Sequence, residues 1–290
     1  MADYININGN NIPIRASDPT NPIEGEVWYN TTTNALKGQA VATADAWASG
    51  TNYPTNIRNQ MGAGSQLAAV QMGGYNGTSY VAATNEYDGS AWTSSGALPA
   101  PQADGRAGGP QTDVIAAGGL VSGTNFQTTS LSYDGSTWSP TPSLNTGRDA
   151  MLGTSTNGSS TAFLIGGGQD SGTPPSFATT ASEEYNGASW TSVNSMNTVR
   201  RRLAGAGANN TSGLAFAGKI SLGPDPVTGA TEVWNGTNWT EVGDMSVARE
   251  YLGSSGTNSS ALGFGGNIPP STTSTEEFNA GPATVSFGDA

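Results

Sequence analysis

Short runs of small and apolar residues alternate with polar, glycine-rich turns along most of the chain, and one pattern returns about every 50 residues. Each unit reads as four strand-sized pieces: one after an arginine, an apolar run ending in glycine, a piece ending at an aromatic residue, and a piece carrying tryptophan. Short runs bounded by turn residues predict β-strands. A fixed period of this length predicts a propeller or a solenoid.

The four marks recur in the same order in every unit. The arginines are Arg58, Arg106, Arg148, Arg200 and Arg249. The apolar runs end at Gly74, Gly119, Gly167, Gly218 and Gly266. The aromatic residues are Tyr87, Tyr133, Tyr185, Trp234 and Phe278, and the tryptophans after them are Trp92, Trp138, Trp190 and Trp239. The fold expected is therefore all-β.

The fifth tryptophan distinguishes a closed ring from an open stack. No tryptophan follows Phe278, but Trp47 precedes the first unit, so every piece occurs five times in cyclic permutation. A ring whose last blade takes its outer strand from the N-terminal side has this arrangement, and closure removes exposed sheet edges. We therefore expect a five-bladed propeller over residues 41–290, closed by the strand around Trp47. The alternative is that Ala283–Phe287 supplies that strand.

Two local features predict how the pieces join. Asp-Gly or Asn-Gly follows the third piece, as in Asp88-Gly89 and Asn186-Gly187, and predicts a two-residue type I′ turn. Glycines end the second piece, and without a side chain they allow a neighbouring backbone to approach closely. The recurring aromatic residues are expected to pack between adjacent blades, where burial of one ring contributes about 2–3 kcal/mol.

Composition excludes several classes of function. The chain has no cysteine and no histidine, which removes cysteine nucleophiles, Ser-His-Asp triads and the usual zinc and copper ligands. Ten basic residues against 22 acidic ones give a net charge of −12, which does not suit binding to phosphates of nucleic acid. No segment has the length or apolarity of a membrane span, and the first residues lack the pattern of a secretory signal.

The order arginine, glycine pair, tyrosine and tryptophan resembles the kelch repeat, and the resemblance covers roughly residues 41–290. One unit shows it in Arg148, Gly166-Gly167, Tyr185 and Trp190. The resemblance implies a kelch-like β-propeller. Its copper-oxidase branch needs histidine and cysteine, so that activity does not carry over. The fourth unit departs from the pattern, since Lys219 follows Gly218.

Residues 1–40 differ from the repeats and form a separate N-terminal attachment segment in this interpretation. The run Gly25-Glu26-Val27-Trp28-Tyr29-Asn30, followed by Leu36-Lys37, resembles a β-hairpin of tailed-bacteriophage virion proteins. The repeats are also similar to those of phage tail and fibre proteins. The resemblance implies that Trp28, Tyr29 and Leu36 take part in virion attachment and that residues 1–40 contact other virion proteins.

Partner binding is expected on the loops between the second and third pieces of each unit. With the four pieces lettered A to D in chain order, these are the B–C loops. In a four-stranded blade they share one face with the D–A connections, and they vary most in length, which is typical of recognition loops on a rigid scaffold. The alternative is that they are merely tolerant surface. The candidate binding residues are Tyr75, Tyr80, Phe126, Asp170, Phe177, Lys219, Asp225 and Asn267.

The sequence gives weaker support for anion binding, metal binding or catalysis. The five arginines either ring an anion site or, as we favour, make repeated structural bonds to carbonyls or to Glu183, Glu232 and Glu276. No cofactor is expected; a Ca²⁺ site could only use Asp170, Asp225 or Asp244, none of which lies in an EF-hand pattern. Paired carboxylates for glycoside hydrolysis stay open, but we expect no enzyme.

The function expected from these features is that of a non-enzymatic structural and adhesion component of a phage virion, tail- or fibre-associated. It would be assembled in the host cytoplasm and would display the propeller toward a glycan or protein of the host surface. Neither nucleic acid nor membrane insertion is expected. The alternatives are a capsid decoration protein without a receptor role, and a glycan-active enzyme or free lectin.

Overall fold

The computed structural model describes residues 12–19, 27–38, 51–122, 125–154, 159–170, 178–220, 227–268 and 271–280. Regular structure in these residues consists of β-strands alone. Accordingly, the described part of the chain contains no helix that could cross a membrane. The chain divides into two compact units, residues 1–49 and residues 50–290.

The N-terminal unit contains one small sheet of three strands. Its order is β1-β2-β3, with β1 parallel to β2 and β2 antiparallel to β3. The strands are β1 (Ile14–Arg15), β2 (Val27–Asn30) and β3 (Ala35–Gly38). The turn between β2 and β3 places Asn34 at a φ of 52°, a left-handed conformation that asparagine tolerates better than most residues.

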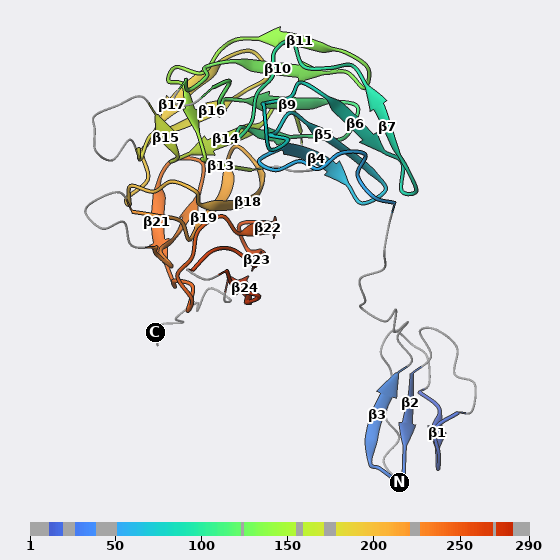
Figure 1. Ribbon diagram of the computed structural model, residues 1–290. Coiled ribbons are helices and arrows are strands. Elements are labelled where there is room, and N and C mark those ends of the chain that lie inside the picture. The colour runs from blue at the N-terminus through green and yellow to red at the C-terminus, as the bar shows by residue number, and fades with distance from the viewer. Residues whose placement is uncertain are drawn as a thin grey trace. The chain divides into compact units, whose positions relative to one another are not determined.

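The second unit is a five-bladed β-propeller, as the sequence predicted (Figure 1). The first two blades comprise β4 (Met61–Ser65), β5 (Ala68–Met72), β6 (Thr84–Tyr87) and β7 (Trp92–Ser95), then β8 (Arg106–Gly108), β9 (Val114–Ala117), β10 (Ser130–Tyr133) and β11 (Trp138–Thr141). The third comprises β13 (Leu152–Gly153), β14 (Phe163–Gly166), β16 (Ser182–Tyr185) and β17 (Trp190–Val193), beside a short pair, β12 (Arg148–Asp149) and β15 (Gln169–Asp170). The last two comprise β18 (Ala204–Asn209), β19 (Ser212–Phe216), β20 (Thr231–Trp234) and β21 (Trp239–Val242), then β22 (Gly253–Gly256), β23 (Ser260–Phe264) and β24 (Thr275–Asn279).

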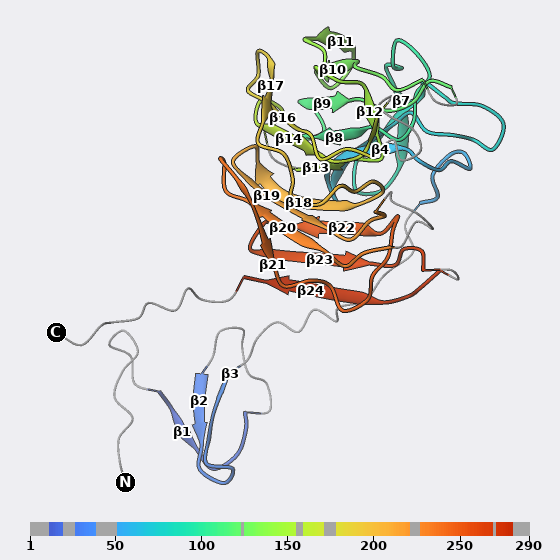
Figure 2. The ribbon, with the colours of Figure 1, turned by 90° about the vertical axis from the view of Figure 1, so that its left-hand side faces the viewer.

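The first strand of each blade faces the centre of the propeller. β4 lies beside β8, β8 beside β13, β13 beside β18, and β18 beside β22. Figure 2 shows the fourth and fifth blades next to each other. A central channel of about 230 Å³ is lined by residues from all five blades, among them Met61, Arg106, Gly153, Gly205 and Ser254.

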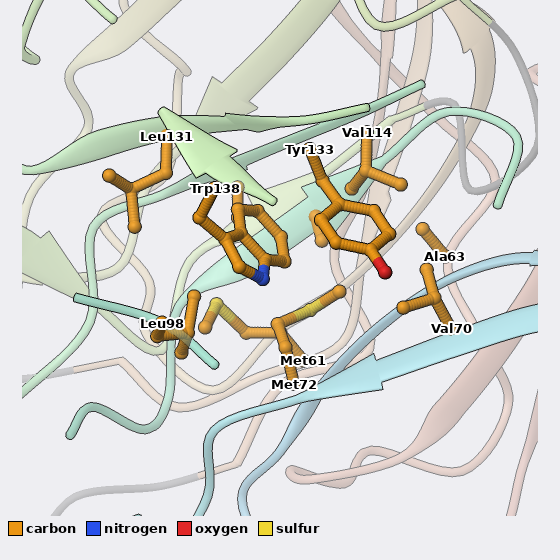
Figure 3. Close-up of a cluster of buried hydrophobic side chains, with 11 residues drawn as sticks. Met61, Ala63, Val70, Met72, Leu98, Val114, Leu131, Tyr133 and Trp138 are labelled. Atoms are coloured by element: carbon orange, nitrogen blue, oxygen red, sulfur yellow. The ribbon is translucent and has the colours of Figure 1, made fainter. Parts of the chain in front are cut away.

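Tryptophan joins each of three blades to the blade before it. The indole Nε1 of Trp138 donates to the Thr84 hydroxyl at 3.0 Å. In the same way Trp190 donates to Ser130 at 3.2 Å and Trp239 to Ser182 at 3.1 Å. Figure 3 shows Trp138 and Tyr133 of the second blade packed against Met61 and Met72 of the first. The predicted packing of aromatic residues between blades is confirmed.

Removal of one such acceptor should weaken the joint between two blades. Ser182 is buried, so Ser182→Ala leaves the Trp239 indole N–H without a partner and is expected to lower the free energy of unfolding by about 1–3 kcal/mol. Urea denaturation measures the loss. Ser189→Ala, at an exposed turn position of the same blade, serves as the control and should change the value by less than about 0.5 kcal/mol. Equal effects of the two variants would contradict the assigned role of the bond.

The predicted two-residue turn between the third and fourth strands is wrong. Tyr87 pairs with Trp92, so the connection has the four residues 88–91, and only Gly89 takes a positive φ. The Asp88 carboxylate accepts hydrogen bonds from the backbone N–H groups of Ser90 and Ala91, both at 2.8 Å. Aspartate and asparagine therefore close this turn by accepting backbone hydrogen bonds with the side chain. The same two residues are also common in turns with left-handed backbone, so the sequence alone does not distinguish the two kinds of turn.

The glycine pairs allow the backbones of neighbouring blades to meet, as predicted. The N–H of Gly119 donates to the carbonyl of Arg148 at 2.7 Å, and a Cβ on Gly118 would lie 2.6 Å from the same oxygen. Two details of the predicted pairs are wrong: the third blade uses Gly167-Gly168 rather than Gly166-Gly167, and the fourth blade departs at Ala217 rather than at Lys219. Ala217 stands at the first position of its pair, with a φ of 60° that matches the glycines. Loss of the glycine therefore leaves the geometry unchanged and strains the alanine.

Among the described residues the last blade has three strands, β22, β23 and β24. Both sequence predictions for a fourth strand, the segment around Trp47 and Ala283–Phe287, fall on residues that the structure does not describe. The closing strand therefore stays a prediction. A cavity of about 710 Å³, lined by Phe216, Thr231 and Phe278 among others, lies between the fourth and fifth blades.

Candidate functional site

The face predicted to bind a partner contains two rings of residues, an outer ring of loops and an inner ring at the channel mouth. At the entry to each blade, a residue of the D–A connection pairs with a residue of the B–C loop. The pairs are Arg58–Tyr75, Ala103–Leu120, Asp149–Gln169, Arg201–Lys219 and Glu250–Asn267. Because each loop is bonded to the entry of its own blade, the loops form a supported ring on one face of the propeller.

A second ring surrounds the mouth of the channel on this face. Its five members are non-glycine residues with left-handed backbone, φ between 48° and 60°: Asn59, Asp104, Ala150, Arg202 and Tyr251. Four backbone hydrogen bonds run around it, from each of the last four residues to the carbonyl of the member before it, at 2.7–3.1 Å. Left-handed backbone costs about 1–2 kcal/mol for a residue with a side chain. Such strain is typical of positions whose side chains serve a function.

A cavity of about 200 Å³ opens at this mouth. It is lined by Asp104, Leu120, Phe126, Asp149, Ala150, Gln169, Arg202 and Tyr251. The second to fifth blades therefore all contribute to it. Two carboxylates, a guanidinium and an amide share the cavity with two aromatic rings, so it offers hydrogen-bond donors, acceptors and apolar faces together.

Two coupled carboxyl groups dominate the electrostatics. Burial, together with the nearby Asp104 carboxylate, raises the pKa of Asp149 to about 7, against the lowering effect of Arg202 and Arg106. The pKa of Asp104 is also raised by burial, although Asn59 donates to its Oδ2 at 2.9 Å. Two negative charges in a poorly solvated place disfavour each other, which adds to the effect of burial on the pKa of Asp149.

The basic groups at the mouth are held by specific partners. Arg202 donates to the Glu250 carboxylate at 3.2 Å, and its guanidinium lies 4.6 Å from the centre of the Tyr251 ring. The Arg201 guanidinium donates to the Gln169 side-chain oxygen at 2.8 Å. The amide nitrogen of the Gln169 side chain can still donate hydrogen bonds. These contacts fix the positions of donors around the cavity.

The predicted binding residues take several places on this face. Phe126 lines the cavity, and Tyr75 and Tyr80 form an edge-on aromatic pair 5.4 Å apart on the first blade. Lys219 and Asn267 stand in the bridges that support the loops, and Asp170 follows the corresponding residue of the third blade. Phe177 and Asp225 lie outside the described residues.

Sequence reasoning missed the acidic and basic residues that the D–A connections bring to the cavity. The equivalent positions of the second to fifth blades carry Asp104, Ala150, Arg202 and Tyr251, which are four different residue types, so no repeated motif marks them. Their spacing of about 46 to 52 residues is the one signal that could have found them, and only the structure shows that they are equivalent. Asp149 comes one residue before the equivalent Ala150.

The predicted structural role of the arginines holds for three of the five. Arg148, Arg200 and Arg249 are at most 1% exposed and donate to Glu183, Glu232 and Glu276 at 2.6–2.8 Å. These ion pairs lie within single blades.

Arg58 and Arg106 are not equivalent to these three. Arg58 pairs with Tyr75 as Arg201 pairs with Lys219, one position later in the blade, and Arg106 begins β8. The position of Arg200 is taken by Ile57 in the first blade and Gln102 in the second. The matching glutamate is also replaced there, by Asn85 and Leu131, so arginine and glutamate are present or absent together.

The loop position that binds each glutamate follows the same rule. The backbone N–H groups of Asn145, Asn197 and Ser246 each donate to the glutamate of their blade at 2.7 Å. Pro54 and Pro99 stand at this position in the blades without glutamate. Proline has no N–H, so these blades contain no donor that needs the missing carboxylate.

The N-terminal unit is organised around Asp18. Its carboxylate accepts hydrogen bonds from the Trp28 indole at 2.9 Å, from Asn30 at 2.7 Å and from Lys37 at 2.6 Å. These bonds lower the pKa of Asp18 to about 2. Trp28 is buried and Tyr29 half-buried, so Trp28 supports the hairpin rather than offering a free surface. The backbone of Leu36 pairs with Tyr29.

No cluster of three metal-ligating side chains occurs in the described part of the chain. Of the residues considered for Ca²⁺, Asp244 instead accepts a hydrogen bond from the backbone N–H of Thr231 at 3.1 Å. Asp170 lies in the loop-supporting pair β12–β15, and Asp225 falls outside the described residues.

Fold and site together define the class of the molecule as a five-bladed β-propeller with a strained, charged channel mouth. The comparisons add no closer identification. No protein-family model matches the chain. No curated protein sequence matches it either.

Proposed function

We propose that the chain is a non-enzymatic adhesion component of a tailed-bacteriophage virion, associated with the tail or a fibre. In this proposal the propeller recognises a receptor on the host surface at the channel mouth. Residues 1–40 attach it to other virion proteins, after assembly in the host cytoplasm. The virion part of the proposal is supported by the sequence resemblance of the hairpin and the repeats.

The observation that best supports a binding role is the ring of strained residues around the mouth. Strain is kept where alanine, arginine and tyrosine occupy left-handed positions that glycine would adopt without cost. The side chains of Arg202 and Tyr251 reach the cavity from these positions. A rigid scaffold that keeps side chains at strained positions around one opening, although they lower its stability, is suited to recognition.

A competition assay tests the adhesion role. Purified chain, added in excess, is expected to reduce adsorption of the phage to its host, because it occupies the same receptors. Immunogold labelling with an antibody to the propeller should mark the tail or fibres. Label confined to the capsid, with no competition, would instead support a decoration protein without a receptor role.

A second candidate function is favoured by one observation. Asp104 and Asp149 both line the cavity, and the pKa of Asp149 is raised to about 7, a direction of shift that glycoside hydrolases use for their general acid. Release of reducing ends from host polysaccharide, lost in both Asp104→Asn and Asp149→Asn, would establish a glycan-active enzyme. Binding without release of products would support the adhesion role.

A further inference from the structure

The cavity at the channel mouth has the size of a small ligand. Its volume of about 200 Å³ lies below the roughly 300–1,000 Å³ of pockets for drug-sized molecules. It would therefore accept one ring or one terminal group of a larger molecule. The position at the open mouth allows the rest of such a molecule to extend over the loops.

An unused acceptor lies in the wall of this cavity. Asp149 is only 6% exposed, and its Oδ1 has no hydrogen-bond partner among the described residues. A buried carboxylate oxygen without a partner costs free energy, and native structures seldom keep one unless a ligand, water or ion serves it. Asp149 lines the cavity, so a small rotation of its carboxylate would present this oxygen to a hydrogen-bond donor of a ligand.

The charges around the cavity disfavour an ionic ligand of either sign. A cation would meet the guanidinium of Arg202 in the cavity wall and the nearby positive charge of Arg106, both of which already interact with the Asp149 carboxylate. An anion would meet Asp149 and Asp104 themselves. A neutral ligand that both donates and accepts hydrogen bonds avoids both repulsions.

The apolar part of the wall points to a flat ligand with a nonpolar face. Phe126 lines the cavity, and the Tyr251 ring is about half exposed, at 51%. Arg202 stacks on Tyr251 and so holds its ring in place. Hydroxyl groups that point outward from a ring with C–H faces match this combination of carboxylates, guanidinium, amide and aromatic rings.

We propose that this cavity is a subsite for one neutral sugar ring, bound by Asp149, Asp104, Gln169 and Arg202 and stacked against Phe126 or Tyr251. The inference rests on the proposed recognition function and names its ligand class. Carboxylates accept from the sugar hydroxyls, and the Arg202 guanidinium and the Gln169 amide donate to them. The rest of the glycan would cross the loops bearing Tyr75 and Tyr80.

Saturation-transfer NMR on the full chain tests the subsite. The probes are the methyl glycosides of glucose, galactose, mannose and N-acetylglucosamine, with glucuronate and glucosamine as charged comparators. At least one neutral glycoside is expected to bind at about millimolar concentration, which is usual for so small a ligand. Asp149→Asn and Phe126→Ala should each weaken it about tenfold.

Glu241→Gln provides the matched control, because it removes one exposed acidic charge from β21, in the outer part of the fourth blade. Its affinity should equal that of the natural chain. Absence of binding by every neutral glycoside, equal binding by all variants, or stronger binding of a charged comparator would each overturn the sugar subsite. Thermal unfolding of each variant shows whether the fold is kept.

Adsorption to host cells separates this inference from the proposed function. If the natural chain and Asp149→Asn bind host cells equally well while neutral glycosides fail to bind, the adhesion role stands and the sugar subsite is wrong. If the natural chain binds no host surface, the proposed function is wrong as well.

Discussion

Replacement of Glu232 by leucine alone should lower the free energy of unfolding by about 3–5 kcal/mol, because it leaves a fully buried arginine without its counter-charge. Arg200 is 0% exposed and donates to Glu232 at 2.7 Å. The same carboxylate also accepts from the backbone N–H groups of Asn197 and Thr198. Its loss therefore leaves several buried donors unsatisfied at once.

The second blade indicates how the loss can be offset. It carries Pro99, Gln102 and Leu131 where the fourth blade carries Asn197, Arg200 and Glu232. The triple variant Asn197→Pro/Arg200→Gln/Glu232→Leu should therefore recover most of the stability lost by Glu232→Leu, because charge, counter-charge and loop donor are removed together. Denaturant unfolding of both variants is the measurement. A triple variant less stable than the single one would refute the idea that the three positions form a unit.

Asp149→Asn should stabilise the protein at pH 8 and have little effect below pH 4. The pKa of Asp149 is raised by burial from 3.8 to about 7. Below the unfolded value the acid is protonated in both states. As pH rises toward 7 the unfolded chain ionises first, so stability falls through this window. Each pKa unit corresponds to about 1.4 kcal/mol, so the gain from the variant approaches roughly 4 kcal/mol above pH 7.

Urea denaturation at pH 4, 6 and 8 measures this dependence. The natural chain and Asp149→Asn should converge at the lowest pH and diverge as pH rises. Asp134→Asn is a useful comparison, since hydrogen bonds from the turn lower the pKa of Asp134 to about 2 and its ionised form stabilises the fold. Asn186 closes the equivalent turn of the third blade through the same bonds, so the difference between this second variant and the natural chain should change little from pH 4 to pH 8. If the free energies of unfolding of the natural chain and Asp149→Asn changed in parallel with pH, the raised pKa of Asp149 would be refuted.

The blade architecture follows from the sequence because its marks are set by packing. An aromatic residue and a tryptophan five positions later must pair across a hairpin, as Tyr133 and Trp138 do. A glycine must stand where the next blade's backbone approaches. These requirements recur in each blade, so the period and the blade number could be predicted.

The details of the turn and the site could not be predicted, for a different reason. Asp-Gly fits both a two-residue turn and a four-residue loop closed by the aspartate side chain, and only the pairing of Tyr87 with Trp92 decides between them. Asp104 and Asp149 lie 45 residues apart in different blades. The ring of left-handed residues brings them together, and backbone conformation of this kind has no fixed sequence signal outside glycine and asparagine.

The most direct test of the account uses the absence of native cysteine, which allows one introduced thiol to be labelled selectively. Ser122→Cys places an exposed thiol in the B–C loop of the second blade, and Ala188→Cys places one in a C–D turn on the opposite face. After coupling of a bulky polymer, adsorption of the chain to host cells is measured. We predict that label at position 122 abolishes adsorption and label at position 188 leaves it unchanged. Equal adsorption of the two labelled chains, or loss only at position 188, would contradict recognition at the channel mouth.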